Sequence, residues 1–178
     1  MPRRPIAPGP LPAPTAAPGP QAGRPRWRAG RRDTFASVLQ GHAPRWSATL
    51  PAVAGTKLVV YIEDNPSNFA LARKLLEWSG KYKVLGARDG VSGLELVMER
   101  RPDVVLLDLD LPGINGIEVV RAIRSNPEIA GIPVLAVSAS VMKRERNQAM
   151  AAGCDSFIEK PFDIHDLRRQ VDEAAGVT

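Results

Sequence analysis

Residues 104–116, VVLLDLDLPGING, place a short apolar run directly before two aspartates and a turn. A continuous apolar run of this length is typical of a strand that is covered on both faces, as in a parallel sheet flanked by helices. The proline and glycines that follow predict a turn into the next helix. The stretch therefore predicts a buried central strand with Asp108 at its end and Asp110 in the loop beyond it.

The chain from Lys57 onward alternates strand-like and helix-like segments. Strands are predicted at 57–62, 82–87, 103–108, 132–139 and 155–160, and helices at 65–80, from 89, at 116–125, at 141–153 and at 163–175. Asn65 and Asp89 are predicted to cap the first two helices. Five β–α units in succession predict a right-handed, doubly wound α/β fold with a parallel sheet. Sites in such sheets form at the carboxyl ends of the strands.

Polar side chains follow four of the five predicted strands. The first strand ends in Glu63 and Asp64, the third in Asp108, the fourth in Ser138 and the fifth in Lys160. Three carboxylates in one place repel each other unless a cation shares them. Because oxygen ligands suit a hard ion and no histidine or cysteine cluster favours zinc, Mg²⁺ is the expected ion. In such a cradle a carboxylate can attack phosphorus and become an acyl phosphate.

The order and spacing of these residues resemble the response-regulator receiver domains of two-component signalling. The resemblance covers residues 57–175 and rests on the segments IEDN, LLDLDLPGINGIEV, VSAS and FIEKPF. The segments NPSNFALARKLLEWSG and KPFDIHDL look most like single-domain regulators of cell-cycle and chemotaxis phosphorelays, which lack an output domain. The fold that we expect is a five-stranded parallel sheet in the flavodoxin-like order 2-1-3-4-5.

The resemblance implies a phosphorylation site that contains a metal ion. Asp108 would accept a phosphoryl group from a phosphohistidine on a sensor histidine kinase or a histidine phosphotransferase. The carboxylates of Glu63, Asp64 and Asp108 would bind Mg²⁺, together with the backbone carbonyl oxygen of Asp110. The chain would then be a phosphoacceptor switch with slow autodephosphorylation and not a turnover enzyme.

The resemblance also implies how phosphorylation changes the protein surface. Ser138 would move to hydrogen-bond the phosphoryl group, Lys160 would pair with it, and Phe157 would turn inward as the switch residue. Since phenylalanine replaces the more frequent tyrosine, the switch would act by packing alone. The bond between Lys160 and Pro161 is expected to be a cis peptide. Downstream protein partners would read the face made by the fourth helix, the fifth strand and the fifth helix.

Residues 1–55 differ from the rest of the chain in composition. They contain 11 of the 17 prolines, eight of the 24 Lys and Arg residues and one acidic residue, which gives about +7 against about −2 for residues 56–178. This segment is expected to be a disordered basic tail, because it cannot bury enough apolar surface to offset chain entropy. An inert leader, or a start codon placed too far upstream, is favoured over a nucleic-acid arm carrying Trp27 and Trp46. Residues 56–178 are expected to form the receiver domain, without direct binding to nucleic acid.

The sequence favours a cytoplasmic protein without a membrane segment. No apolar stretch approaches the roughly 20 residues that cross a bilayer. Arg31 and Arg32 are not followed by the apolar core of an export signal. Cys154 is the single cysteine, which excludes an intramolecular disulfide and fits a reducing compartment.

Two other functions are open at this stage. The segment LLDLDLP, residues 106–112, also resembles the nucleophile motif of haloacid-dehalogenase phosphatases, in which the first aspartate attacks phosphorus. That motif belongs on the first strand of its domain with an acidic pair downstream, whereas the acidic pair here lies upstream. The second alternative is a degenerate receiver that serves only as a docking module, which the intact site residues disfavour.

Overall fold

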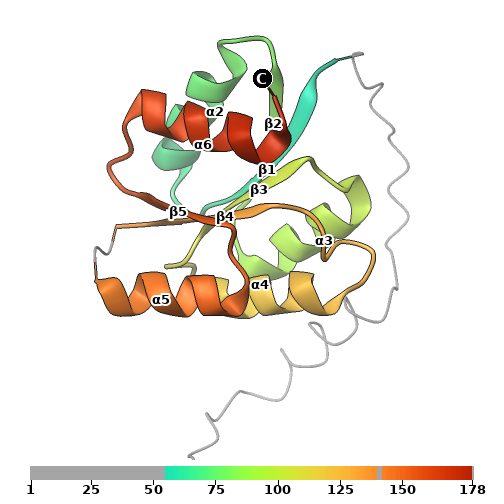
Figure 1. The fold of residues 1–178 in the computed structure, drawn as a ribbon, viewed down its shortest axis with the longest axis vertical. Helices are drawn as coiled ribbons and strands as arrows, with labels where there is room; N and C mark the ends of the chain where they lie inside the picture. The colour runs from blue at the N-terminus through green and yellow to red at the C-terminus, as the bar shows by residue number, and fades with distance from the viewer. Residues whose placement is uncertain (1–54, 140–141, 178) are drawn as a thin grey trace, which may run out of the picture.

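The computed structural model describes residues 55–139 and 142–177. In this part of the chain five parallel strands form one sheet in the order β2-β1-β3-β4-β5 (Figure 1). The strands are β1 (Lys57–Ile62), β2 (Tyr82–Ala87), β3 (Val104–Asp108), β4 (Val134–Ser138) and β5 (Ser156–Glu159). The helices are α2 (Pro66–Glu77), α3 (Gly90–Arg100), α4 (Gly116–Ser125), α5 (Lys143–Ala152) and α6 (Ile164–Ala175). The predicted α/β fold and strand order are confirmed.

The prediction of a disordered basic tail concerns residues 1–55, and all of these except Gly55 lie outside the described residues. The two tryptophans considered as stacking residues, Trp27 and Trp46, lie outside them as well.

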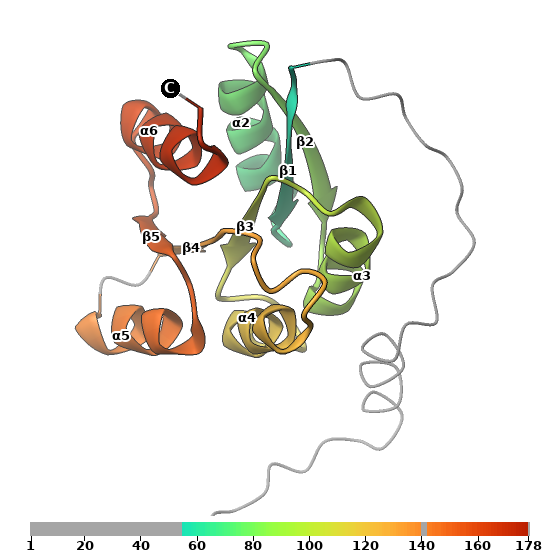
Figure 2. The same ribbon diagram turned by 45° about the vertical axis from the view of Figure 1, so that its right-hand side comes forward.

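Helices cover both faces of the sheet. Helices α2 and α6 lie on one face and α3, α4 and α5 on the other (Figures 1 and 2). The side chains of β3 alternate between the two cores, with Val104 and Leu106 packing on the α2 and α6 side and Val105 and Leu107 on the other. All four of these side chains are fully buried, which is why the run is apolar without interruption.

The helix starts follow local polar signals. Asn65 accepts hydrogen bonds from the backbone of Ser67 and Asn68, and Asp89 does the same at the start of α3, so both predicted N-caps are confirmed. Helix α5 begins at Lys143, later than predicted, and no side chain caps it. Within the described residues, no helix combines the length and apolar character needed to span a membrane.

The register of the sheet brings the polar strand ends together. Ile62 of β1 pairs with Leu107 of β3, so Glu63 follows β1 at the level of Asp108. Ser138 of β4 pairs with Glu159, the last residue of β5, and Lys160 follows directly after that strand. The carboxyl ends of these strands therefore form one edge, at which the polar side chains meet.

Candidate functional site

Three carboxylates form an acidic cluster at the carboxyl edge of the sheet. Glu63, Asp64 and Asp108 each bring one oxygen to within 4.8 Å of the others. Glu63 and Asp108 are buried, at 2% and 3% exposure, whereas Asp64 is exposed. Buried carboxylates that remain charged need a positive partner, because burial disfavours the charged form.

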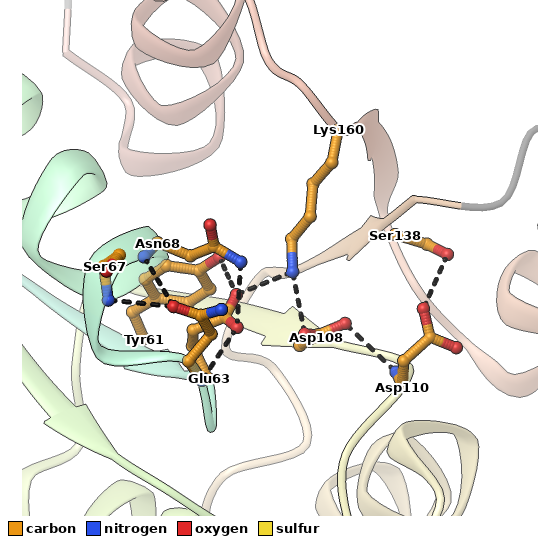
Figure 3. Close-up of polar contacts among 9 residues, drawn as sticks. Tyr61, Glu63, Ser67, Asn68, Asp108, Asp110, Ser138 and Lys160 are labelled. Atoms are coloured by element: carbon orange, nitrogen blue, oxygen red, sulfur yellow. Dashed lines mark hydrogen bonds and ion pairs between the residues drawn. The ribbon is translucent and has the colours of Figure 1, made fainter.

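Lys160 is that positive partner. Its Nζ atom lies 2.7 Å from Oε2 of Glu63 and 2.7 Å from Oδ2 of Asp108. Figure 3 shows the lysine side chain reaching down from the end of β5 with its ammonium between the two carboxylates. The peptide bond between Lys160 and Pro161 is cis. The fifth strand thus delivers a cation to acids that the first and third strands supply.

The two buried carboxylates are compensated unequally. Burial raises the pKa of Glu63, but hydrogen bonds from Lys160 and Tyr61 outweigh it and leave that pKa below its ordinary value. Burial also raises the pKa of Asp108, and here the bonds from Lys160 and from the Asp110 amide offset it only in part, so this pKa is above its ordinary value. Burial lowers the pKa of Lys160, but its two carboxylate partners raise it above the ordinary value, so the ammonium stays charged.

Asp110 and Ser138 lie on the other side of Asp108. The backbone N–H of Asp110 donates to Oδ1 of Asp108 at 3.0 Å. Ser138 is fully buried, and its hydroxyl lies at a long hydrogen-bond distance of 3.5 Å from Oδ2 of Asp110 (Figure 3). Asp110 itself is exposed, so its side chain sits at the rim of the site.

Phe157, the predicted switch residue, lies on β5 outside this hydrogen-bonded cluster. Its ring is partly buried and packs against the core on the α3, α4 and α5 side of the sheet. The guanidinium carbon of Arg146, from α5, lies 5.8 Å from the centre of the ring. This distance fits a cation–π contact, which connects α5 to β5.

The sequence reasoning missed three groups that bond Glu63. The hydroxyl of Tyr61 donates to Oε2 at 2.6 Å, while the Asn65 amide and the Asn68 side chain donate to Oε1 at 3.1 and 3.3 Å. The signal for Tyr61 was present, because residues two apart on a strand share a face and the tyrosine interrupts the aliphatic run Leu58–Ile62. Asn68 gave no comparable signal.

Residues 59–172 match the response regulator receiver domain family, and the chain belongs to this family. Membership makes the protein a phosphoacceptor module of two-component signalling rather than an enzyme, and it implies a kinase as partner. The resemblance of residues 106–112 to a phosphatase motif is therefore not a sign of phosphatase activity.

The relatives include short regulators and receiver domains of larger proteins. The polar-differentiation response regulator DivK of Brucella anthropi is 39% identical over 108 residues, which are 61% of this chain and 87% of that protein. DivK of Brucella ovis is 38% identical over 109 residues, covering 61% and 88%. The receiver domain of the sensor histidine kinase PA1611 of Pseudomonas aeruginosa, solved with a magnesium ion in its active-site cleft, is 27% identical with a TM-score of 0.64. That match covers 68% of this chain and 98% of the solved one.

Proposed function

We propose that this protein is a phosphorelay response regulator that accepts a phosphoryl group on Asp108. The observation that carries the proposal is the double ion pair of Lys160, which joins Asp108 to Glu63 at 2.7 Å each at the end of the central strands. This arrangement places a nucleophilic carboxylate beside a cation and beside two further acids. It supplies the positive and metal-binding groups that phosphoryl transfer requires around one carboxylate.

The proposed reaction is a displacement at phosphorus. A carboxylate oxygen of Asp108 attacks the phosphorus of a phosphohistidine on a sensor histidine kinase or a histidine phosphotransferase. The O–P bond forms as the P–N bond breaks, and the bonding electron pair returns to the imidazole. Water later attacks the acyl phosphate slowly, which releases phosphate and restores the carboxylate. Lys160 would pair with the phosphoryl oxygens, and its bond to Oδ2 of Asp108 supports this role.

The donor set fits Mg²⁺. The three clustered carboxylates offer only oxygen ligands, and their oxygens lie within 4.8 Å of one another. Octahedral Mg²⁺ binds oxygen at about 2.1 Å, so its ligands lie up to about 4.2 Å apart and the cluster is near the required size. Glu63, Asp64, Asp108 and the backbone carbonyl of Asp110 are the proposed ligands. The bound ion would neutralise charge on the transferring oxygens.

The proposed switch connects the site to one face of the domain. Ser138 would leave the neighbourhood of Asp110 to hydrogen-bond the phosphoryl group, and Phe157 would then turn inward. The contact of Arg146 with the Phe157 ring supports this proposal, because movement of the ring would change or break its contact with α5. The face of α5, β5 and α6 is the proposed surface for a downstream protein partner.

The remaining parts of the proposal concern domain organisation and location. We propose that residues 56–178 form the receiver unit and that residues 1–55 are dispensable for phosphorylation. The similarity to DivK, a polar-differentiation response regulator, covers 61% of this chain and supports a signalling role. In the proposed role the protein acts through protein partners in the cytoplasm. Direct binding to nucleic acid forms no part of the proposed role.

Mass spectrometry of the intact protein tests the phosphoacceptor. After incubation with phosphoramidate and Mg²⁺, the wild type should gain about 80 Da, the mass of one phosphoryl group on an acyl phosphate. Asp108→Asn should gain nothing, and excess EDTA should suppress labelling of the wild type. Asp103→Asn, at the loop before the same strand, is the matched control and should label normally. Labelling of Asp108→Asn at the wild-type level would refute Asp108 as the phosphoacceptor. Full labelling of the wild type in EDTA would refute the requirement for Mg²⁺. Deletion of residues 1–55 should leave labelling unchanged.

A further inference from the structure

Tyr61 is a polar residue at the centre of the core below the acidic cluster. It is fully buried on the face of β1 that packs against α2 and α6. A buried tyrosine hydroxyl needs a hydrogen-bond partner, and this one donates to Oε2 of Glu63 at 2.6 Å (Figure 3). Burial and the bond to Glu63 both raise the pKa of Tyr61, so the phenol is neutral and acts as a donor.

The carboxylate of Glu63 has its full complement of donors. Oε2 accepts from Tyr61 and Lys160, and Oε1 accepts from the Asn65 amide and the Asn68 side chain. An ionised carboxylate offers about four lone-pair positions, and all four are used. Of these donors only Lys160 is charged, and it is shared with Asp108.

The position of the Tyr61 hydroxyl is set by packing. The ring of Phe69, from α2, lies against the Tyr61 ring with 6.2 Å between centres and a tilt of 35°. Phe69 in turn lies over Gly86 of β2, where an added Cβ would come within 2.4 Å of the ring. Glycine at this position therefore makes room for Phe69, whose ring packs against Tyr61.

We propose that Tyr61 is a positioning residue for the magnesium site. Its hydroxyl would hold the Glu63 carboxylate in place if Mg²⁺ competed with Lys160 for the carboxylates. Without the Tyr61 hydroxyl, Glu63 would keep only two longer hydrogen bonds from neutral donors, at 3.1 and 3.3 Å. The Glu63 side chain would then change rotamer more readily. Groups that orient a metal ligand in this way typically contribute 10- to 100-fold to metal affinity. The inference rests on the proposed function, because it assumes that Mg²⁺ binds beside Glu63.

The test compares the two tyrosines of the chain. Tyr61→Phe keeps the ring and removes the hydroxyl from Glu63. Tyr82→Phe is the matched control, because it removes a buried hydroxyl from Asp172 at the opposite end of the sheet. Isothermal titration of the full chain with MgCl₂ should show about tenfold weaker binding by Tyr61→Phe and an unchanged Kd for Tyr82→Phe.

A second readout separates positioning from folding. The Mg²⁺ concentration for half-maximal labelling by phosphoramidate should rise about tenfold in Tyr61→Phe, while the rate at saturating Mg²⁺ stays within about twofold of the wild type. A general loss of structure would instead lower the rate at saturating Mg²⁺ as well. The inference is overturned if Tyr61→Phe binds Mg²⁺ as the wild type does, or if both tyrosine variants lose affinity equally. Absence of Mg²⁺ binding by the wild type would instead refute the metal site of the proposed function, and this inference with it.

Discussion

The ammonium of Lys160 and the carboxylate of Asp108 lie 2.7 Å apart at the carboxyl edge of the sheet, 52 residues apart in the chain. The same ammonium lies 2.7 Å from Glu63, so one lysine is shared by two buried acids. One positive charge against two carboxylates compensates the negative charge of the site only in part.

Loss of Lys160 should destabilise the protein most when no metal is present. Lys160→Met leaves two buried carboxylates without a cation, so the free energy of unfolding in EDTA should fall by about 3 kcal/mol. Addition of Mg²⁺ should recover part of this loss, because the ion replaces the ammonium. Urea denaturation in EDTA and in Mg²⁺ measures both values.

The control is another lysine–aspartate pair. Lys57 lies 2.9 Å from Asp103, and both side chains are more than one-third exposed. Lys57→Met should therefore cost less than about 1 kcal/mol, with no dependence on Mg²⁺. Equal losses for the two lysine variants would contradict the role given to Lys160.

Removal of the charge on Asp110 should speed reactions at Asp108. Its carboxylate lies at the rim of the site near Ser138, where it repels an anionic phosphodonor or an attacking hydroxide. A unit charge a few ångströms away in water-like surroundings acts with about 1 kcal/mol, so Asp110→Asn should raise the rates of phosphorylation and dephosphorylation about fivefold. The two rates are measured by mass spectrometry, as the appearance and later loss of protein that is heavier by about 80 Da, the mass of one phosphoryl group.

Glu128→Gln is the control for the removal of one negative charge. Glu128 is exposed and precedes β4, at the opposite edge of the sheet from Asp108. Rates in this variant should equal those of the wild type. Unchanged rates in Asp110→Asn would show that the rim charge plays no part.

A methyl group at Gly116 should disturb the backbone that carries Asp108. An added Cβ at Gly116 would come within 2.6 Å of the Asp108 carbonyl oxygen and 2.8 Å of the Leu109 Cα. Because backbone atoms must shift to admit it, Gly116→Ala should lower the free energy of unfolding by about 2 kcal/mol and slow labelling. Gly131→Ala meets nothing within 4 Å and should stay within about 0.5 kcal/mol of the wild type. Similar stabilities of the two alanine variants would contradict this packing.

Cys154 should be unreactive in the folded protein. Burial raises the pKa of its thiol to about 11, and the thiolate is the reactive form. At pH 8 the thiol of the folded protein should react with Ellman's reagent at least about 100-fold more slowly than the thiol of protein unfolded in guanidinium chloride. The folded state holds the thiol proton of Cys154 more tightly than the unfolded state does, so the free energy of unfolding should fall as pH rises from about 9 to about 11. Cys154→Ala should lessen that fall. Fast reaction of the native thiol at pH 8 would contradict its burial.

Much of this fold could be predicted because its signals are local. Apolar runs that alternate with helical segments predicted the position of each of the five strands. The unbroken apolar run from Val104 to Leu107 predicted a strand buried on both faces, and all four side chains are fully buried. The acids, Ser138 and Lys160 could be placed at one edge because parallel strands end together. The start of helix α5 was predicted at residue 141 but lies at Lys143, because no side-chain cap marks it and Ala149 is its single buried residue.

The sequence by itself therefore determined which residues end each strand, and hence which side chains form the site. Only the tertiary structure decided how they share charge and hydrogen bonds. That Lys160 bridges Glu63 and Asp108, and that Tyr61 supports one of these acids alone, depends on rotamers and strand register. The opposite pKa shifts of the two carboxylates follow from these contacts and from burial. Such quantities depend on distances between groups far apart in the chain, which local patterns of residues do not contain.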